Sequence, residues 1–167
     1  ATTNSPLRAG KGWLYEGGIR VPLFVKWDRE LKPHIEQESI VLGMDVFPTL
    51  LELALNKKIK NIDGKSYASV LKGKNTWEDR TVFWISRKAR PHSTGDSKMI
   101  AVRSGDYKLV QYIETKQLEL YNLKEDISEE FNLSDKEPEK MNQLLKQLND
   151  WKEEMLVPKR LDVGKNK

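Results

Sequence analysis

The clearest hydrophobic pattern lies in the second half of the chain and predicts an antiparallel sheet. Residues 81–85, 99–103, 107–113 and 117–123 are rich in β-branched and aromatic side chains, and polar segments separate them. Ser104-Gly105-Asp106 is a hairpin signal between the second and third runs. Four strands connected in this way form a meander, and such a sheet needs apolar packing on at least one face.

A helix with one apolar face follows the predicted sheet. Pro138 stands at its start, where proline is tolerated. Apolar side chains then recur at spacings of three and four residues: Met141, Leu144, Leu145, Leu148, Trp151 and Met155. We therefore expect this helix to pack across the sheet.

The first half of the chain predicts an incomplete strand–helix segment. Residues 19–27 form a mostly apolar run typical of a buried strand, with Pro22 near its beginning. A helix follows from Asp45, which can cap it, and Pro48 falls in its first turn. A strand buried on both faces needs neighbouring strands, so we expect the rest of its sheet to lie upstream of this chain. The predicted class is α+β, with the edge of an α/β domain preceding the four-stranded sheet and its C-terminal helix.

Composition narrows the class of protein without naming a function. Hydrophobic residues make up 38% of the 167 residues and charged residues 32%, which is typical of a globular chain. No apolar run is long enough to predict a membrane span. The net charge of +4 is spread among interleaved lysines and glutamates, which argues against a nucleic-acid partner. Cysteine is absent, which excludes a thiolate nucleophile and cysteine-based zinc sites within these residues.

Candidate chemistry is sparse and centres on one lysine. Lys11 stands between Gly10 and Gly12, and glycines on both sides let the backbone approach a ligand closely. An ammonium group in such a loop can face an oxyanion. On the residues alone, however, a solvated surface lysine is the more common case.

Five motifs in order resemble the sulfatase family. The first is the run Gly10-Lys11-Gly12-Trp13-Leu14-Tyr15-Glu16-Gly17-Gly18-Ile19-Arg20-Val21-Pro22, which resembles the sulfatase signature. The other four are Asp45-Val46-Phe47-Pro48-Thr49-Leu50-Leu51, Asp63-Gly64-Lys65-Ser66, Val102-Arg103-Ser104-Gly105-Asp106-Tyr107-Lys108-Leu109, and Leu118-Glu119-Leu120-Tyr121-Asn122-Leu123 with the residues that follow it. The resemblance extends over residues 5–157.

The resemblance implies a C-terminal part of a formylglycine-dependent sulfatase. Residues 1–76 would be the end of the catalytic α/β domain, residues 77–158 a small sheet-and-helix subdomain, and residues 159–167 a basic tail. The nucleophile motif and the ligands of the family's calcium ion would lie in the missing N-terminal part of the same chain, so we expect this fragment alone to bind no metal and to be inactive. Lys11 matches the family's sulfate-contacting lysine, while Tyr15, Glu16 and Arg20 would brace the loop.

A second candidate region is the loop of residues 87–98. In some sulfatases a similar stretch lies near the substrate entrance, and Arg87, Arg90 and His92 are our candidates for binding a sugar or its anionic groups. Ile85 stands where that pattern has histidine, which puts a histidine contact there in doubt. A solvated basic loop is an equally frequent explanation.

The resemblance predicts hydrolysis of sulfate monoesters, with a sulfated small molecule or sugar as the partner. It also implies a periplasmic or secreted enzyme. Two alternatives stay open: a non-catalytic module that binds glycan or protein, and part of a related phosphate or phosphonate monoester hydrolase.

Overall fold

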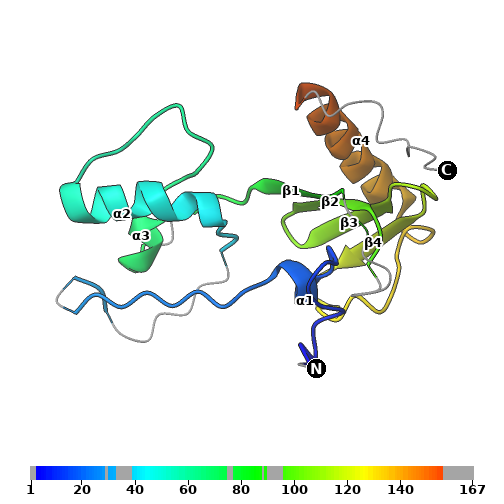
Figure 1. Ribbon diagram of the computed structural model, residues 1–167, viewed down its shortest axis with the longest axis horizontal. Coiled ribbons are helices and arrows are strands. Elements are labelled where there is room, and N and C mark those ends of the chain that lie inside the picture. Colours follow the sequence, from blue (N-terminus) through cyan, green and yellow to red (C-terminus); the bar gives the residue numbers. More distant parts are fainter. Residues whose placement is uncertain are drawn as a thin grey trace. The chain divides into compact units, whose positions relative to one another are not determined.

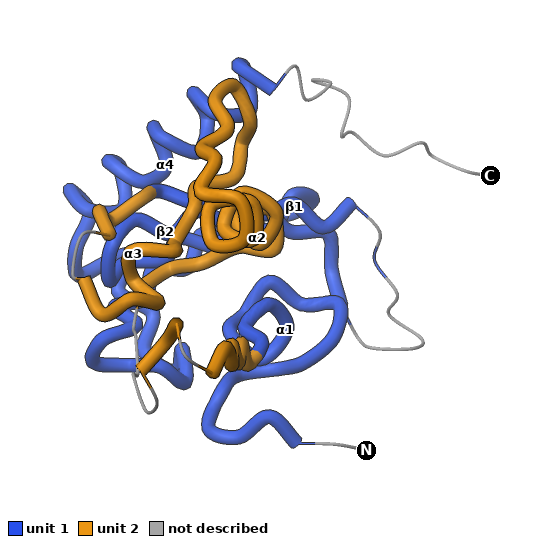
Figure 2. Tube along the Cα trace, turned by 90° about the vertical axis from the view of Figure 1, so that its left-hand side faces the viewer, with its two compact units in different colours: residues 1–21, 81–167 blue, residues 22–80 orange. Residues whose placement is uncertain are grey.

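The chain folds into two compact units that are described separately. The computed structural model describes residues 3–28, 30–32, 39–74, 77–87, 89 and 96–155. Unit 1 consists of residues 1–21 and 81–167, and unit 2 of residues 22–80 (Figure 2). Packing thus groups the N-terminal residues with the sheet, and the assignment of residues 1–76 to the catalytic domain of a complete enzyme stays a prediction. The tail of residues 159–167 lies outside the described residues.

Unit 1 contains the predicted antiparallel sheet. Its strands are β1 (Thr81–Ser86), β2 (Met99–Ser104), β3 (Tyr107–Tyr112) and β4 (Leu118–Asn122), in the order β1-β2-β3-β4 (Figure 1). Ser104 pairs with Tyr107 across the predicted hairpin, whose turn contains Gly105. The φ angle of 59° at Gly105 lies in the left-handed region that glycine adopts without strain. The predicted four-stranded meander is confirmed.

Helix α4 (Pro138–Glu154) covers one face of the sheet, as predicted (Figure 1). Leu144 and Leu148 are buried against apolar side chains of β2, β3 and β4. Trp151 stacks on Phe83 of β1, with ring centroids 4.8 Å apart. Met155 was predicted to share this face, but the helix ends before it and its side chain is 58% exposed.

The opposite face of the sheet is covered by the N-terminal residues, which the sequence did not predict. Leu14 and Tyr15 pack there in a core with side chains from β2, β3 and β4: Met99, Ala101, Val110, Tyr121 and, just after β4, Leu123. A single helical turn, α1 (Glu16–Ile19), follows them (Figure 1). Four successive buried residues in β2, 99–102, reflect this packing on both faces.

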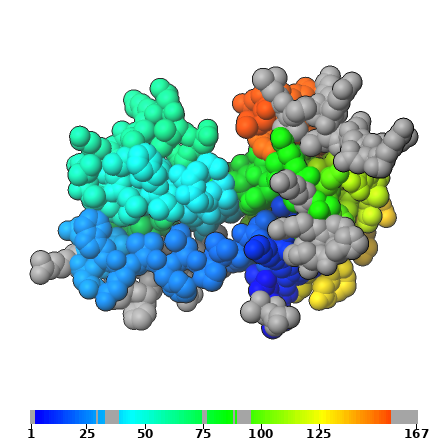
Figure 3. Space-filling model, in the orientation of Figure 1, coloured from blue at the N-terminus to red at the C-terminus, as the bar shows by residue number. Residues whose placement is uncertain are grey.

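The strand predicted over residues 19–27 is not formed. Ile19 ends α1, and the residues after it make no regular structure. Their side chains lie at the surface in the space-filling view (Figure 3), with Val21 77% and Phe24 92% exposed. The cause is physical, because among the described residues no other strand pairs with this segment, and an isolated strand is not stable in water.

Unit 2 is built around one buried carboxylate. It contains the 3₁₀ turn η1 (Gly43–Asp45), α2 (Val46–Leu55) and α3 (Ala68–Leu71). We predicted that the side chain of Asp45 caps α2, and this is wrong. The carboxylate instead accepts hydrogen bonds from the backbone N–H groups of Leu42 and Lys65 and from the Arg80 guanidinium. Pro48 does lie in the first turn of α2.

Two of the recognised motifs meet in unit 2. The hydroxyl of Thr49 donates to the carbonyl of Asp45 at 2.6 Å and accepts the N–H of Tyr67 at 3.0 Å. A Cβ atom at Gly64 would lie 2.1 Å from the carbonyl oxygen of Met44, so only glycine fits there. Both motifs therefore serve the local fold of this unit.

Candidate functional site

The loop around Lys11 carries an exposed ammonium group. The backbone turns there through a hydrogen bond from Trp13 N–H to the carbonyl of Gly10, 3.1 Å long. Gly12 adopts a φ of 106°, which favours glycine. The side chain of Lys11 is exposed and makes no hydrogen bond or ion pair within the described part of the chain. The loop thus holds a cation that is available to a ligand.

Two glycines hold this loop by close backbone contact. A Cβ atom at Gly17 would lie 2.5 Å from the carbonyl oxygens of both Arg8 and Ala9. At Gly18 it would lie 2.2 Å from the oxygen of Trp13 and 2.5 Å from that of Gly10. Only glycine fits at positions 17 and 18, because the backbone of α1 packs directly against the backbone of the segment that carries Lys11.

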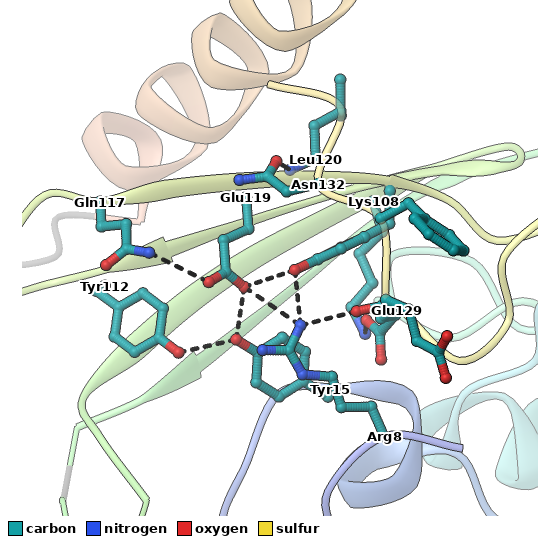
Figure 4. A network of polar contacts seen from close by, with 12 residues as sticks. Arg8, Tyr15, Lys108, Tyr112, Gln117, Glu119, Leu120, Glu129 and Asn132 are labelled. Atoms are coloured by element: carbon teal, nitrogen blue, oxygen red, sulfur yellow. Dashed lines mark hydrogen bonds and ion pairs between the residues drawn. The ribbon is translucent and has the colours of Figure 1, made fainter. Parts of the chain in front are cut away.

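A network of phenol, carboxylate and guanidinium groups fastens the same segment to the sheet (Figure 4). The Tyr15 hydroxyl donates to Glu119 Oε2 at 2.5 Å and shares a 2.8 Å hydrogen bond with the Tyr112 hydroxyl. Glu119 Oε2 also accepts the Tyr121 hydroxyl at 2.8 Å. Burial and the hydrogen bond to Glu119 raise the pKa of both Tyr15 and Tyr121. These phenols stay neutral and act as donors.

Arg8 closes this network from the N-terminal side. Its guanidinium lies 3.9 Å from the centroid of the Tyr15 ring, within cation–π range. Its Nη1 donates to the Tyr121 hydroxyl at 2.7 Å and to the carbonyl of Glu129 at 2.8 Å. Residues on both sides of Lys11 are thereby tied to β4 and to the loop after it.

A second, more deeply buried set of charges is centred on Lys108. Its Nζ lies 2.9 Å from Glu16 Oε1 and 2.8 Å from Glu129 Oε1, and the Lys108 side chain is fully buried. Glu129 Oε2 in turn accepts the backbone N–H of Glu16 at 2.7 Å. Burial raises the pKa of the Glu129 carboxyl, while Lys108 and the Glu16 N–H oppose that shift.

The three residues predicted to brace the loop differ in how firmly they are held. Tyr15 and Glu16 are buried and bonded to the sheet, as described above. Arg20 contributes less, since its guanidinium is half exposed and 3.9 Å from Glu16 Oε2. Arg103 approaches the same oxygen at 3.7 Å. Most of the signature, residues 10–22, thus serves to hold the Lys11 loop against the sheet.

The predicted substrate-binding residues are only partly described. Arg87 follows the last residue of β1 and is exposed, while Arg90 and His92 lie outside the described residues. No hydrogen bond or ion pair among the described residues joins Arg87 to Lys11. That Arg87, Arg90 and His92 bind a sugar or its anionic groups stays a prediction.

Sequence reasoning missed four charged residues that hold the site: Arg8, Lys108, Glu119 and Glu129. The available signal was the alternation of the strands, because Lys108 and Val110 point to the same face of β3, and Val110 is a core residue. A lysine at an inward-facing strand position needs a buried partner. The sequence gives no local sign that the partners are Glu16 and Glu129.

Metal chemistry has no support in these residues. In the part of the chain that the structure describes, no three His, Cys, Asp or Glu side chains are grouped so that they could hold a metal ion. The calcium ion that the resemblance implies therefore does not fit the described residues, and no step is assigned to it. None of the described helices combines the length and apolarity that crossing a membrane requires.

Fold, loop and motifs together define the C-terminal part of a sulfatase, and comparison with known proteins agrees. Residues 9–156 match the family "N-sulphoglucosamine sulphohydrolase, C-terminal". A sulfatase of Formosa agariphila is 37% identical over 82% of this chain and 27% of its own length. An uncharacterised sulfatase of Schizosaccharomyces pombe is 31% identical over 84% of this chain and 26% of its own. The chain therefore belongs to this sulfatase family.

Solved structures show the same fold. The crystal structure of Ps i-CgsB in complex with k-i-k-neocarrahexaose has a TM-score of 0.72 and 25% identity, and the match covers 89% of this chain and 32% of that one. A 2-O GAG sulfatase has a TM-score of 0.51 and 27% identity over 66% of this chain and 24% of its own. The chain spans about a quarter of the length of the curated relatives named above.

Proposed function

We propose that this chain is the C-terminal part of an enzyme that hydrolyses sulfate monoesters of carbohydrates, and that Lys11 is its contribution to the active site. Membership of the sulfatase family supports the reaction class. The carbohydrate substrate is supported by the similar structure bound to k-i-k-neocarrahexaose and by the similar 2-O GAG sulfatase. By the same resemblance, the enzyme is periplasmic or secreted, which fractionation of cells that produce it would test.

The observation that carries the proposal is the exposed Lys11 ammonium, which has no partner among the described residues and lies on a loop held by backbone contacts. Cleavage of a sulfate ester leaves negative charge on the oxygen that bridged sulfur and carbon. A fixed cation near that oxygen stabilises the transition state more than the ground state, and removing one such group costs roughly 3–4 kcal/mol in comparable sites. The contacts at Gly17 and Gly18 supply the rigidity that this role requires.

The family's nucleophile and calcium ion belong to the remainder of the enzyme in this proposal. Formylglycine dependence is implied by the family, and the described residues include no group of three His, Cys, Asp or Glu side chains that could hold a metal ion. We accordingly expect the 167-residue chain alone to release no sulfate from an aryl sulfate. Turnover by the purified chain at the rate of the complete enzyme would refute that expectation.

The test is replacement of Lys11 by alanine in the complete enzyme, with sulfate release measured on a sulfated oligosaccharide and on 4-nitrophenyl sulfate. We expect kcat on the oligosaccharide to fall by roughly 100-fold or more. The loss on 4-nitrophenyl sulfate should be smaller, because nitrophenolate is a good leaving group that needs little stabilisation. Lys124→Ala is the matched control, since that lysine is also exposed and lies in the same unit.

An unchanged kcat in Lys11→Ala would remove this residue from the active site. If the unaltered enzyme bound the oligosaccharide without releasing sulfate, the non-catalytic module would be the better assignment. For Arg87, Arg90 and His92 we propose contacts with the rest of the sugar. Arg87→Ala should accordingly raise KM for the oligosaccharide and leave KM for 4-nitrophenyl sulfate unchanged, and equal effects on both substrates would contradict this role.

A further inference from the structure

Burying Lys108 in the sheet costs desolvation free energy. Its side chain has no exposed surface, and it lies between two carboxylates, Glu16 and Glu129, of which Glu129 is also fully buried. Desolvating such charges costs several kcal/mol per ion, and apolar side chains of similar volume often serve stability equally well. Stability alone is therefore a weak explanation for these buried charges. Their contacts indicate that they fix the position of the N-terminal segment.

The buried charges fix one residue of the N-terminal segment in two ways. Lys108 binds the carboxylate of Glu16 at 2.9 Å, which fixes its side chain. Glu129 accepts the N–H of Glu16 at 2.7 Å, which fixes its backbone. Glu129 and Lys108 also contact each other at 2.8 Å, so the three groups form a closed set. Residue 16 is consequently held to the sheet in both position and orientation.

A short path of rigid contacts leads from residue 16 to Lys11. Glu16 is the first residue of α1, and the next two residues press on the Lys11 loop. The N–H of Gly17 donates to the carbonyl of Arg8 at 2.9 Å, while the α-carbon of Gly18 faces the carbonyls of Gly10 and Trp13. These are backbone contacts with no side chain to absorb a displacement. A shift of residue 16 must therefore move the loop.

We propose that Lys108 and Glu129 are positioning residues for Lys11. The sheet then determines where the Lys11 ammonium stands relative to the sulfate ester, although neither residue touches the substrate. This inference rests on the proposed function of Lys11 and adds to it the residues that set its geometry. Arg103 and Arg20 approach Glu16 at 3.7 and 3.9 Å and have a secondary part, because both are partly exposed.

The experiment is a double-mutant cycle in the complete enzyme with Glu129→Gln and Lys11→Ala. Glutamine keeps the shape of the side chain but loses the charge that binds Lys108. With Lys11 present, we expect Glu129→Gln to lower kcat by roughly 10-fold, within the ~100-fold that a misplacement of about 1 Å can cost. KM should change by less than about 2-fold. In the Lys11→Ala background, the same substitution should change kcat by less than about 2-fold, because the group that it positions is gone.

Leu148→Ala is the control for stability. It removes a fully buried side chain from the core on the opposite face of the sheet, which does not include the Glu16 contacts. We expect a lower Tm with kcat of the folded enzyme unchanged in both backgrounds. If Glu129→Gln does not fold, Glu129→Asp gives the same comparison, because it keeps the charge and withdraws it by one methylene group.

The outcomes separate this inference from the proposed function. If Lys11→Ala leaves kcat unchanged, the proposed role of Lys11 fails, and the positioning inference fails with it. If Lys11→Ala lowers kcat but the Glu129 substitution lowers it equally in both backgrounds, Lys11 keeps its role and the positioning inference is wrong. A kcat that Glu129→Gln does not change when Lys11 is present would also overturn the inference. A loss confined to the enzyme that contains Lys11 supports it.

Discussion

Replacing Gly18 by alanine should disturb the Lys11 loop directly. The added Cβ atom would stand 2.2 Å from the carbonyl oxygen of Trp13 and 2.5 Å from that of Gly10. An ordinary contact needs about 3.5 Å, so the two backbone segments must separate by roughly 1 Å. Both neighbouring atoms belong to the backbone, and no side chain can rotate away to relieve the contact.

The expected cost has two measurable parts. Overpacking of this kind lowers the free energy of unfolding by about 1–3 kcal/mol. A displacement of about 1 Å at Lys11 should also lower kcat by up to about 100-fold, because the ammonium no longer faces the leaving oxygen. Urea denaturation of the complete enzyme measures the first part, and sulfate release from a sulfated oligosaccharide measures the second.

Gly43→Ala is the matched control for this substitution. A Cβ atom at Gly43 would meet nothing within 4 Å, so neither stability nor kcat should fall. The reasoning is refuted if Gly18→Ala matches the control in both measurements. A loss of stability with normal kcat would show that the loop tolerates displacement, and it would also weaken the positioning role of Lys108 and Glu129.

Two further predictions concern the buried polar groups. Arg80→Ala should lower the free energy of unfolding by about 3–5 kcal/mol, since it leaves the fully buried Asp45 carboxylate without its cation; an unchanged urea midpoint would contradict this. The raised pKa of Tyr15 and Tyr121 means that the folded state keeps protons that the unfolded state releases above about pH 10, so stability should fall as pH rises beyond that value. Tyr15→Phe should reduce the total loss of stability between pH 9 and pH 11 by about 1.4 kcal/mol in urea denaturation, and an unchanged loss would show that Tyr15 ionises equally in both states.

The sheet and its helix could be predicted because their signals are local. The alternation of β-branched and aromatic residues, the Ser104-Gly105-Asp106 turn and the helical spacing from Met141 to Trp151 each lie within one element. The signature around Lys11 was equally visible as a motif. Its physical reason was not, because a glycine pair in a sequence does not show which carbonyl groups lie against it.

The charge network could not be predicted because its pairs are distant in sequence. Lys108 and Glu16 are 92 positions apart, and Tyr15 and Glu119 are 104 positions apart. Local pattern shows only that Lys108 and Glu119 stand at inward-facing strand positions. It cannot show that the layer covering them is the N-terminal segment. Only the folded chain reveals that the first and last motifs of the sequence form one structure.

The failed strand prediction over residues 19–27 has a physical explanation that bears on the whole protein. Unit 1 buries two apolar cores of its own, one on each face of its sheet. Apart from Phe131 and Met155, the exposed large apolar residues of the described chain all fall between Val21 and Ile62. Apolar side chains at strand spacing gain stability only when neighbouring strands cover them. The chain spans about a quarter of the length of its curated relatives. The apolar pattern of residues 19–27 favours a strand, but the described residues include no neighbouring strand that could pair with it. The strand-like sequence and the exposed side chains are therefore compatible.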